Sequence, residues 1–439
     1  MTRTGWREAV GVPGGDALDR SLAYIAPDGS LAVFNDHVRH ETVVVDRPQL
    51  EPEERQVAAN WRGPTPGPHP VGTGESVEGY GVFTFPYGPV SMGVPESGAF
   101  DLRTYGERVL ELVPIAGYKC RGIAASVVGH PWTEAALQVE RLAGPFSAAH
   151  VSAFLLAAES AEGRAVPTSE LWVRAVAQEL QRIYCHLHVV ARIAEAAAQN
   201  VGAAQSHALA EEALRIAARC FGHRWMFGVL LPGGPARRVG PDDRRDLDHR
   251  LRALGKEFEE IWDLFLASRT FVDRIQATAA VAAADAVRWG AVGPTLRACG
   301  VPWDDRLRSP TYPYSDLFLS MPLENDGDAL ARVLVRSSEI RASLHLLDQL
   351  LDRWPGEGTA AEVPSAPIRP GRGISRVEAP SGDLVYDVEV SDGIVRSLGM
   401  RSASQANWPV FALGMRGAVF TDFHFALESF GLVFADTDG

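Results

Sequence analysis

The chain has 439 residues, 46% of them apolar, which is enough for a large folded core or for two or three domains. Its formal net charge of −13 excludes a general electrostatic affinity for nucleic acid or for an anionic lipid surface. The four cysteines stand far apart and form no CxxC pair, which excludes a zinc ribbon or a cysteine-ligated cluster built by this chain alone.

We interpret the first 75 residues as a short appendage that ends in a Pro/Gly linker. Strand-like runs occur at Ala23 to Ile25 and at Glu41 to Val45, and the segment from Arg62 to Ser76 is rich in proline and glycine. We therefore place a boundary there and assign residues 76–439 to one main domain.

The main domain opens with β structure. The alternation from Tyr80 to Phe85 predicts a strand, and two strand-like runs, Phe100 to Thr104 and Arg108 to Val113, flank a turn at Gly106 as a hairpin. Near the C-terminus, three more strands are predicted between Ser375 and Met400.

Helices dominate the middle of the chain. The stretch from Ser147 to Ala158 carries no formal charge if His150 is neutral, which predicts a buried helix with Ser147 as its N-cap and Gly163 as its stop. Apolar residues spaced by three and four predict further long helices within 168–200, 247–265 and 340–351. The expected fold is mainly α (α+β): a central bundle of long helices, the buried helix included, with small antiparallel β elements at both flanks.

The sequence contains only weak candidates for a metal-binding motif. His186 and His188 are two positions apart on a predicted helix and therefore point to different sides, so packing roles suit them better than metal binding. No Glu-x-x-His or His-Glu-x-x-His occurs anywhere in the chain. No metal site is predicted from these residues.

The order of longer motifs, from about residue 80 onward, resembles the large subunit of [NiFe]-hydrogenases of the formate-hydrogenlyase and hydrogenase-4 type, and equally the quinone-side large subunit of respiratory complex I. Eight motifs carry the resemblance: GPVSMG from Gly88, GYKCRGI from Gly117, QVERLAGPFSAAH from Gln138, ELQRIYCHL from Glu179, FGHRW and PGG between Phe221 and Gly234, WGAVGPTLRACG from Trp289, GDALARVLVRSSEIRAS from Gly327, and the NWP…RG…DF…SF tail.

The resemblance also indicates what this chain lacks. In the hydrogenases four thiolates hold nickel, and the matching positions here are Ala143, Phe146, Val433 and Asp436. None is a cysteine, so a nickel–iron centre of the family type cannot form.

The quinone-site positions of complex I are altered as well. They match Ser91 and Ala196, neither of which can act as an acid or base near neutral pH. The polar residues retained at family positions are Arg121, Arg141, His150 and Arg224, which are either catalytic candidates or hydrogen-bonded scaffold residues.

The resemblance implies a subunit of a membrane-associated oxidoreductase, NADH:quinone oxidoreductase-like or hydrogenase-like. It would carry no cofactor itself, pack on a small subunit with a [4Fe–4S] cluster, associate with antiporter-like membrane subunits, and lie on the cytoplasmic face of the membrane through those partners. Quinone is a possible acceptor. The alternatives are a catalytically silent scaffold in such a complex and, disfavoured by the missing thiolates, a true [NiFe]-hydrogenase.

If the fold persists without metal, other groups must fill the ligand space, because protein cores tolerate few voids. The turn from Ala143 to Phe146 should then lie against the tail from Val433 to Asp436, with backbone atoms within roughly 10 Å of each other. Asp436 should find a hydrogen-bond donor there, and Arg141 is the leading candidate.

Overall fold

The computed structural model describes residues 22–25, 31–34, 42–45, 69–70, 77–91, 93–308, 313–355, 362–363 and 370–437. The predicted linker at 62–76 lies outside these residues except for 69–70, and the proposed domain boundary at residue 75 stays a prediction. Two of the early strand predictions fall on described backbone. β1 (Leu22–Ile25) and β3 (Thr42–Val45) both pair with β2 (Leu31–Phe34) in an antiparallel sheet.

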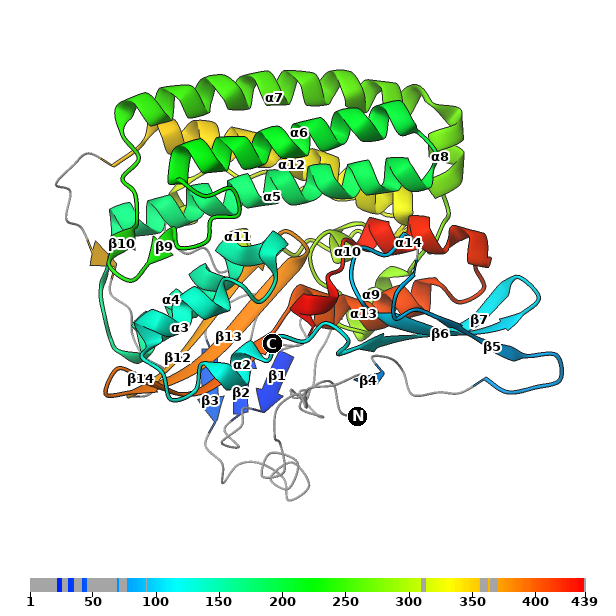
Figure 1. Cartoon of the computed structure of the whole chain (residues 1–439), viewed down its shortest axis with the longest axis horizontal. Helices are drawn as coiled ribbons and strands as arrows, with labels where there is room; N and C mark the ends of the chain where they lie inside the picture. The colour runs from blue at the N-terminus through cyan, green and yellow to red at the C-terminus, as the bar shows by residue number, and fades with distance from the viewer. Residues whose placement is uncertain are drawn as a thin grey trace.

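Four long helices form one layer of the main domain (Figure 1). Three of them are the predicted ones, and they are longer than the apolar spacing alone suggested: α5 (Thr168–Ala196), α7 (Pro241–Ala267) and α12 (Ala329–Asp352). The fourth, α6 (Asn200–Phe221), packs between α5 and α7. The prediction of a mainly helical core is confirmed.

Helix α6 was not predicted because four of its ten buried residues are alanines, which contrast little with their neighbours. The small residues allow close packing. A Cβ atom placed on Gly202 would stand 2.6 Å from the Phe265 ring of α7, so only a glycine fits at this crossing.

The charge-free helix is α4 (Ser147–Ala161), and almost all of its residues are buried, as predicted. It is not part of the bundle, however. It lies between α5 and an antiparallel sheet formed by β12 (Arg372–Ala379), β13 (Gly382–Ser391) and β14 (Ile394–Arg401) (Figure 1). Its burial on all sides therefore comes from the sheet as well as from helices.

The ends of α4 differ in part from the prediction. Ser147 is the first helical residue rather than the cap; its hydroxyl donates to the Trp225 carbonyl at 2.5 Å. A 3-10 turn, Gly144–Phe146, supplies the entry instead. Gly163, at φ 62°, follows the C-cap and stops the helix as predicted.

The second sheet, in the order β4-β7-β6-β5, contains the predicted hairpin. Its strands are β4 (His69–Pro70), β5 (Phe83–Tyr87), β6 (Ala99–Tyr105) and β7 (Arg108–Ala116). Strand β5 begins three residues later than predicted, because a turn closed by the Val82 N–H and the Gly79 carbonyl precedes it. The sheet packs on an aromatic core shared with α13 (Ala403–Gly414) and α14 (Phe423–Phe430).

The remaining elements are short connectors. The helices among them are α2 (Ile123–Ser126), α3 (Trp132–Val139), α8 (Arg269–Ile275), α9 (Ala283–Arg288), α10 (Pro294–Arg297) and α11 (Asp305–Arg308), and the strands are β8 (Val166–Pro167), β9 (Leu230–Leu231), β10 (Gly234–Pro235) and β11 (Glu362–Val363). Within the described ranges, no single helix has the length and apolarity needed to cross a membrane. Only α3 and the segment Gly144–Ala161 reach that threshold when counted together, and they are bent by 120°.

The contact between β12 and α4 gives a direct test of this arrangement. A Cβ atom on Gly373 would stand 2.0 Å from the Ala157 carbonyl oxygen, and backbone cannot move aside as a side chain can. We expect Gly373→Ala to lower the free energy of unfolding by about 2 kcal/mol or more, the typical cost of overpacking a core. Gly79→Ala is the control, because its nearest neighbour would be 3.6 Å away; it should change stability by less than about 0.5 kcal/mol in chemical denaturation. Equal effects would contradict the packing.

Candidate functional site

The candidate site forms where four loops from distant parts of the chain meet. The loop after β5 and the C-terminal tail are in direct contact, since a Cβ atom on Gly98 would overlap the Phe434 ring at 2.1 Å. Glu96 joins them to a third loop: it pairs with Lys119 at 2.9 Å and accepts a hydrogen bond from the Ala435 N–H at 3.3 Å. None of these contacts follows from sequence spacing.

Arg121 joins this third loop to the fourth segment. Its side chain is at the surface, and one guanidinium nitrogen donates to the carbonyl of Leu142, directly before Ala143. The exposed loop carrying Arg121 is thereby fixed to the turn that leads into α4. Of the four retained polar residues, Arg121 and His150 are the two that the structure brings to this junction.

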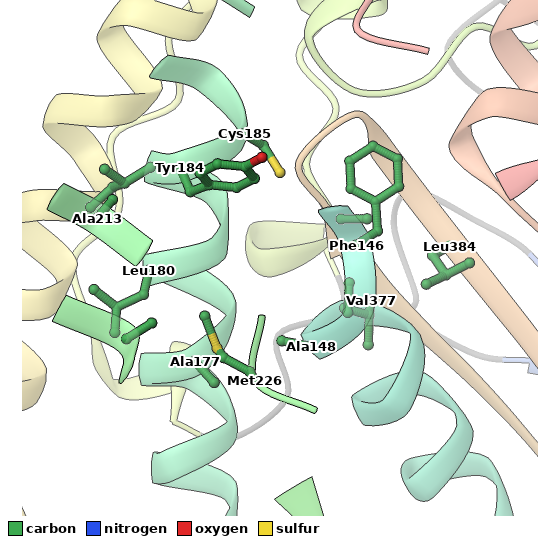
Figure 2. Close-up of a cluster of buried hydrophobic side chains, with 14 of the residues drawn as sticks. Phe146, Ala148, Ala177, Leu180, Tyr184, Cys185, Ala213, Met226, Val377 and Leu384 are labelled. Atoms are coloured by element: carbon green, nitrogen blue, oxygen red, sulfur yellow. The ribbon is translucent and has the colours of Figure 1, made fainter. Parts of the chain in front are cut away.

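Phe146, at one of the former ligand positions, is built into the hydrophobic core. Figure 2 shows its ring between the start of α4, Cys185 of α5, and the strands that carry Val377 and Leu384. Only 3% of Phe146 is exposed, and the Cys185 thiol beside it donates to the Pro145 carbonyl at 3.1 Å. Burial raises the pKa of the Cys185 thiol, so it stays protonated and is a poor metal ligand.

Asp436, at another former ligand position, is buried and bound to α4. One carboxylate oxygen is 2.9 Å from His150 Nε2, and the other accepts a hydrogen bond from the Ser404 N–H at 3.2 Å. The other ring nitrogen of His150, Nδ1, is 2.9 Å from the Tyr386 hydroxyl on β13. Burial, followed by the Asp436 charge, raises the pKa of Tyr386, so its hydroxyl stays neutral and can donate to Nδ1.

This chain of contacts corrects one prediction. Arg141 does not reach Asp436; its side chain is 58% exposed, stacks over the Phe227 ring at 4.8 Å and donates to the Leu137 carbonyl. Arg141 follows the last turn of α3 and points outward, so His150 provides the donor instead. The expected meeting of the tail with the start of α4 is supported by the His150–Asp436 contact, one turn beyond Phe146. The backbone separation of roughly 10 Å stays a prediction.

Arg224 also lies away from the junction. It is paired with Glu211 of α6 on the surface of the bundle.

Glu140, at the end of α3, is a buried acid near the turn that leads into α4. Burial raises the pKa of Glu140, and the Gly228 N–H donates to one of its oxygens at 2.7 Å.

The two altered quinone-site positions are linked through the end of α5. Arg192 donates to the Gly93 carbonyl at 2.5 Å and pairs with Glu428 at 2.8 Å, which fixes the loop of Ser91 against the last turns of the helix that ends at Ala196. The hydroxyl of Ser91 is buried without a hydrogen-bond partner. Neither side chain provides an acid or base.

The two histidines of α5 have separate roles. His186 is 2.8 Å from Glu339 of α12, while His188 stacks on Tyr184. Burial lowers the pKa of both histidines to about 4, so both are neutral at physiological pH. Within the described part of the chain, no group of three or more His, Cys, Asp or Glu side chains is placed to hold a metal ion.

Comparisons with known proteins give the relatives that this chain resembles. Residues 205–371 match the family model of the respiratory-chain NADH dehydrogenase 49 Kd subunit. The carbon monoxide-induced hydrogenase of Rhodospirillum rubrum is 28% identical over 79% of this chain and 96% of its own length, and the membrane-bound hydrogenase subunit alpha of Pyrococcus furiosus is 28% identical over 70% and 75%. A subunit of the NADH-quinone oxidoreductase of Rhodospirillum rubrum is 27% identical over 81% and 98%.

Over most of its length the chain is therefore similar to subunits of hydrogenases and of NADH-quinone oxidoreductases. A solved subunit of the membrane-bound sulfane sulfur reductase, an archaeal respiratory membrane complex, has the same fold, with a TM-score of 0.75 and 24% identity over 82% of this chain and 98% of that one. The predicted resemblance and fold class are therefore confirmed.

The ligand positions predicted from the hydrogenase resemblance lack the donor set for a nickel–iron centre. They carry Ala143, Phe146, Val433 and Asp436, which offer one carboxylate and no thiolate. That carboxylate is already bonded to His150 and Ser404, and Phe146 is in the core. The residues present do not fit the metal group.

Sequence reasoning identified His150 and Asp436 separately but missed their pairing, and it missed Tyr386 altogether. The one usable signal was that a tyrosine in a strand buried on both faces needs a hydrogen-bond partner for its hydroxyl. Nothing in the sequence identifies that partner, 236 positions away.

The hydrogen bonds of Asp436 should hold the tail in place. Asp436→Ala leaves two buried donors, His150 Nε2 and the Ser404 N–H, without an acceptor, so we expect a loss of about 3 kcal/mol in the free energy of unfolding. Hydrogen exchange of the Ser404 amide should accelerate as well. Asp348→Ala removes an exposed partner of Arg252 and should cost less than about 1 kcal/mol. Similar losses for both variants would show that the tail contact contributes little.

Proposed function

We propose that this chain is the large subunit of a complex I-like or hydrogenase-type membrane-associated oxidoreductase and contributes to electron transfer toward a quinone or a related acceptor, without a nickel–iron centre. The observation that carries the proposal is the junction of four loops beside the ligand positions predicted from the resemblance, with Arg121 at its surface. The relatives are themselves named as subunits of hydrogenases and quinone oxidoreductases.

The proposed partner is a small subunit that carries a [4Fe–4S] cluster and packs over Arg121. Exposed apolar residues beside it, Tyr118 and Val128 among them, suit a protein contact. We further propose antiporter-like membrane subunits as partners and a position on the cytoplasmic face of the membrane. The large subunit would then be held at the membrane by those partners.

A catalytically silent scaffold is the second candidate. It is favoured by the closed Tyr386–His150–Asp436 chain, in which all three side chains are buried, and by the loss of acid–base groups at Ser91 and Ala196. In that role the large subunit would retain the fold only to hold its partners together. A true [NiFe]-hydrogenase is disfavoured by the donor set.

Isolation of the complex from its native cells distinguishes these roles. We expect the chain to co-purify with an iron–sulfur subunit, to contain less than stoichiometric nickel, and to support electron transfer to a soluble quinone. A complex that assembles but does not reduce quinone, with intact cluster spectra, would favour the scaffold. About one nickel per chain would contradict the assignment of the ligand positions.

Arg121 provides a sharper test of contact with the cluster. A guanidinium near the cluster stabilises the negative charge added on reduction, so Arg121→Met should lower the cluster's reduction potential. An interaction of roughly 1 kcal/mol corresponds to about 40 mV for one electron. The measurement is a redox titration of the assembled complex. Arg215→Met, an exposed change on α6, is the matched control and should leave the potential unchanged. An unchanged potential in both variants would count against the placement of Arg121.

A further inference from the structure

A network of buried charges lies outside the candidate site, between α5, α11, α12 and the β12–β13 hairpin. It contains more acids than bases. The carboxyl groups are Glu179, Asp304, Asp305, Glu339, Glu378 and Asp383, six in all, and the guanidinium groups within ion-pair distance of them are Arg182, Arg297, Arg306, Arg376 and Arg401, five in all. Apart from Arg376 and Arg401, which are slightly exposed, these side chains are almost completely buried.

A sixth guanidinium, Arg336, lies beside this network, but among the described residues it makes no direct ion pair with any of the six carboxyl groups. His186 faces Glu339 as a neutral imidazole, and Arg336 donates to His186 and to the carbonyls of Ser429 and Phe430. Tyr314 and Ser343 donate hydroxyl hydrogen bonds to Glu179. A buried carboxylate in excess of its counter-charges is costly, and the usual relief is uptake of a proton.

The contacts identify which carboxyl group takes the proton. Asp383 is held by Arg376 at 2.8 Å and by Arg401 at 3.3 Å. Asp304 is held by Arg306 at 2.6 Å. Asp305 is different: it is 4% exposed, Arg376 approaches it only to 3.4 Å, and both of its oxygens are buried without a hydrogen-bond donor.

We propose that this network is a proton-binding site in which Asp305 is a neutral carboxylic acid at physiological pH and donates its proton as a hydrogen bond to the Asp383 carboxylate. Such a bond gives Asp305 a hydrogen-bond partner and leaves five carboxylates for the five guanidinium groups that pair with them directly. It is also consistent with the unoccupied lone pairs of Asp305, because the acid acts as a donor rather than as an acceptor.

The local electrostatics support this arrangement. Burial, together with Asp383, raises the pKa of Asp305 well above its usual value. Burial acts in the same direction on Asp383, but Arg376, the hydrogen bond from Asp305 and Arg401 together outweigh it and hold that pKa at about 2. Burial and Asp304 raise the pKa of Glu378, the cross-strand neighbour of Asp383, to about 7. Glu378 is therefore the rival holder of the proton, and it releases its own proton near neutral pH.

Infrared spectroscopy of the purified full-length chain, labelled with carbonyl-¹³C aspartate, tests the proposal at a pH one unit above the Glu378 pKa. We expect a carboxylic-acid C=O band that shifts with the label. This band should be lost in Asp305→Asn, because asparagine has no carboxylic acid group. The amide keeps the shape of the side chain and still provides a hydrogen-bond donor for Asp383. The thermal unfolding midpoint of Asp305→Asn should be no lower than that of the wild type, because the amide needs no proton uptake on folding. Asp304→Asn is the matched control: it should lower the midpoint and retain the band.

Several results would overturn the proposal. Absence of the labelled band in the wild-type protein would be sufficient to overturn the proposal. This measurement does not depend on whether any variant folds. Persistence of the band in Asp305→Asn, or its loss in Glu378→Gln, would place the proton elsewhere. An Asp305→Asn variant that unfolds, or loses as much stability as Asp304→Asn, would show that Asp305 acts as a charged partner of Arg376.

Glu378→Gln gives an independent result for the second acid. A carboxyl group whose folded pKa is raised contributes most stability below its unfolded value, and that contribution is lost as the pH rises toward 7. In wild type the unfolding midpoint should therefore fall across this window. The fall should be smaller in Glu378→Gln. It should also be smaller in Asp305→Asn, because in wild type Asp305 keeps its proton in the folded state while the unfolded chain releases it. An unchanged fall in Glu378→Gln would contradict this division between the two acids.

Discussion

The tertiary structure depends on the carboxylate of Glu179, which is fully buried at the centre of α5. It accepts hydrogen bonds from Tyr314 at 2.7 Å and from Ser343 at 2.6 Å, and it pairs with Arg182 and Arg306 at 3.3 and 3.1 Å. One side chain thus joins α5, α11, α12 and the segment before α12. Removal of a partner from a buried charge costs more than the pair itself contributes, so these segments are constrained to one arrangement.

A second set of buried contacts joins the turn before α4 to the C-terminal tail, the two segments that carry the ligand positions predicted from the hydrogenase resemblance. Phe146 fills part of the space at the start of α4 with apolar surface, and the His150–Asp436 hydrogen bond connects the two segments. The contacts of Glu96 and Phe434 hold the tail from the other side.

These two regions differ in what they can do chemically. The closed site near α4 offers a neutral tyrosine, a histidine and a carboxylate that bond to one another and to the Ser404 N–H. The charge network near β12 has more carboxyl groups than guanidinium groups paired directly with them. The core therefore retains titratable groups outside the candidate site.

The sequence by itself determined the elements with strong local signals and the family. The spacing of apolar residues predicted α5, α7 and α12, the charge-free run predicted α4, and paired turn residues predicted the hairpins; each depends on residues close together in the chain. The eight ordered motifs identified the family, and the missing cysteines excluded its metal centre. Only the tertiary structure decided that α4 packs on a sheet, that α6 completes the bundle, that Arg141 points outward, and that His150 meets Asp436. The physical reason is that these outcomes depend on contacts between residues up to 286 positions apart, whose free energy exists only once the chain is folded.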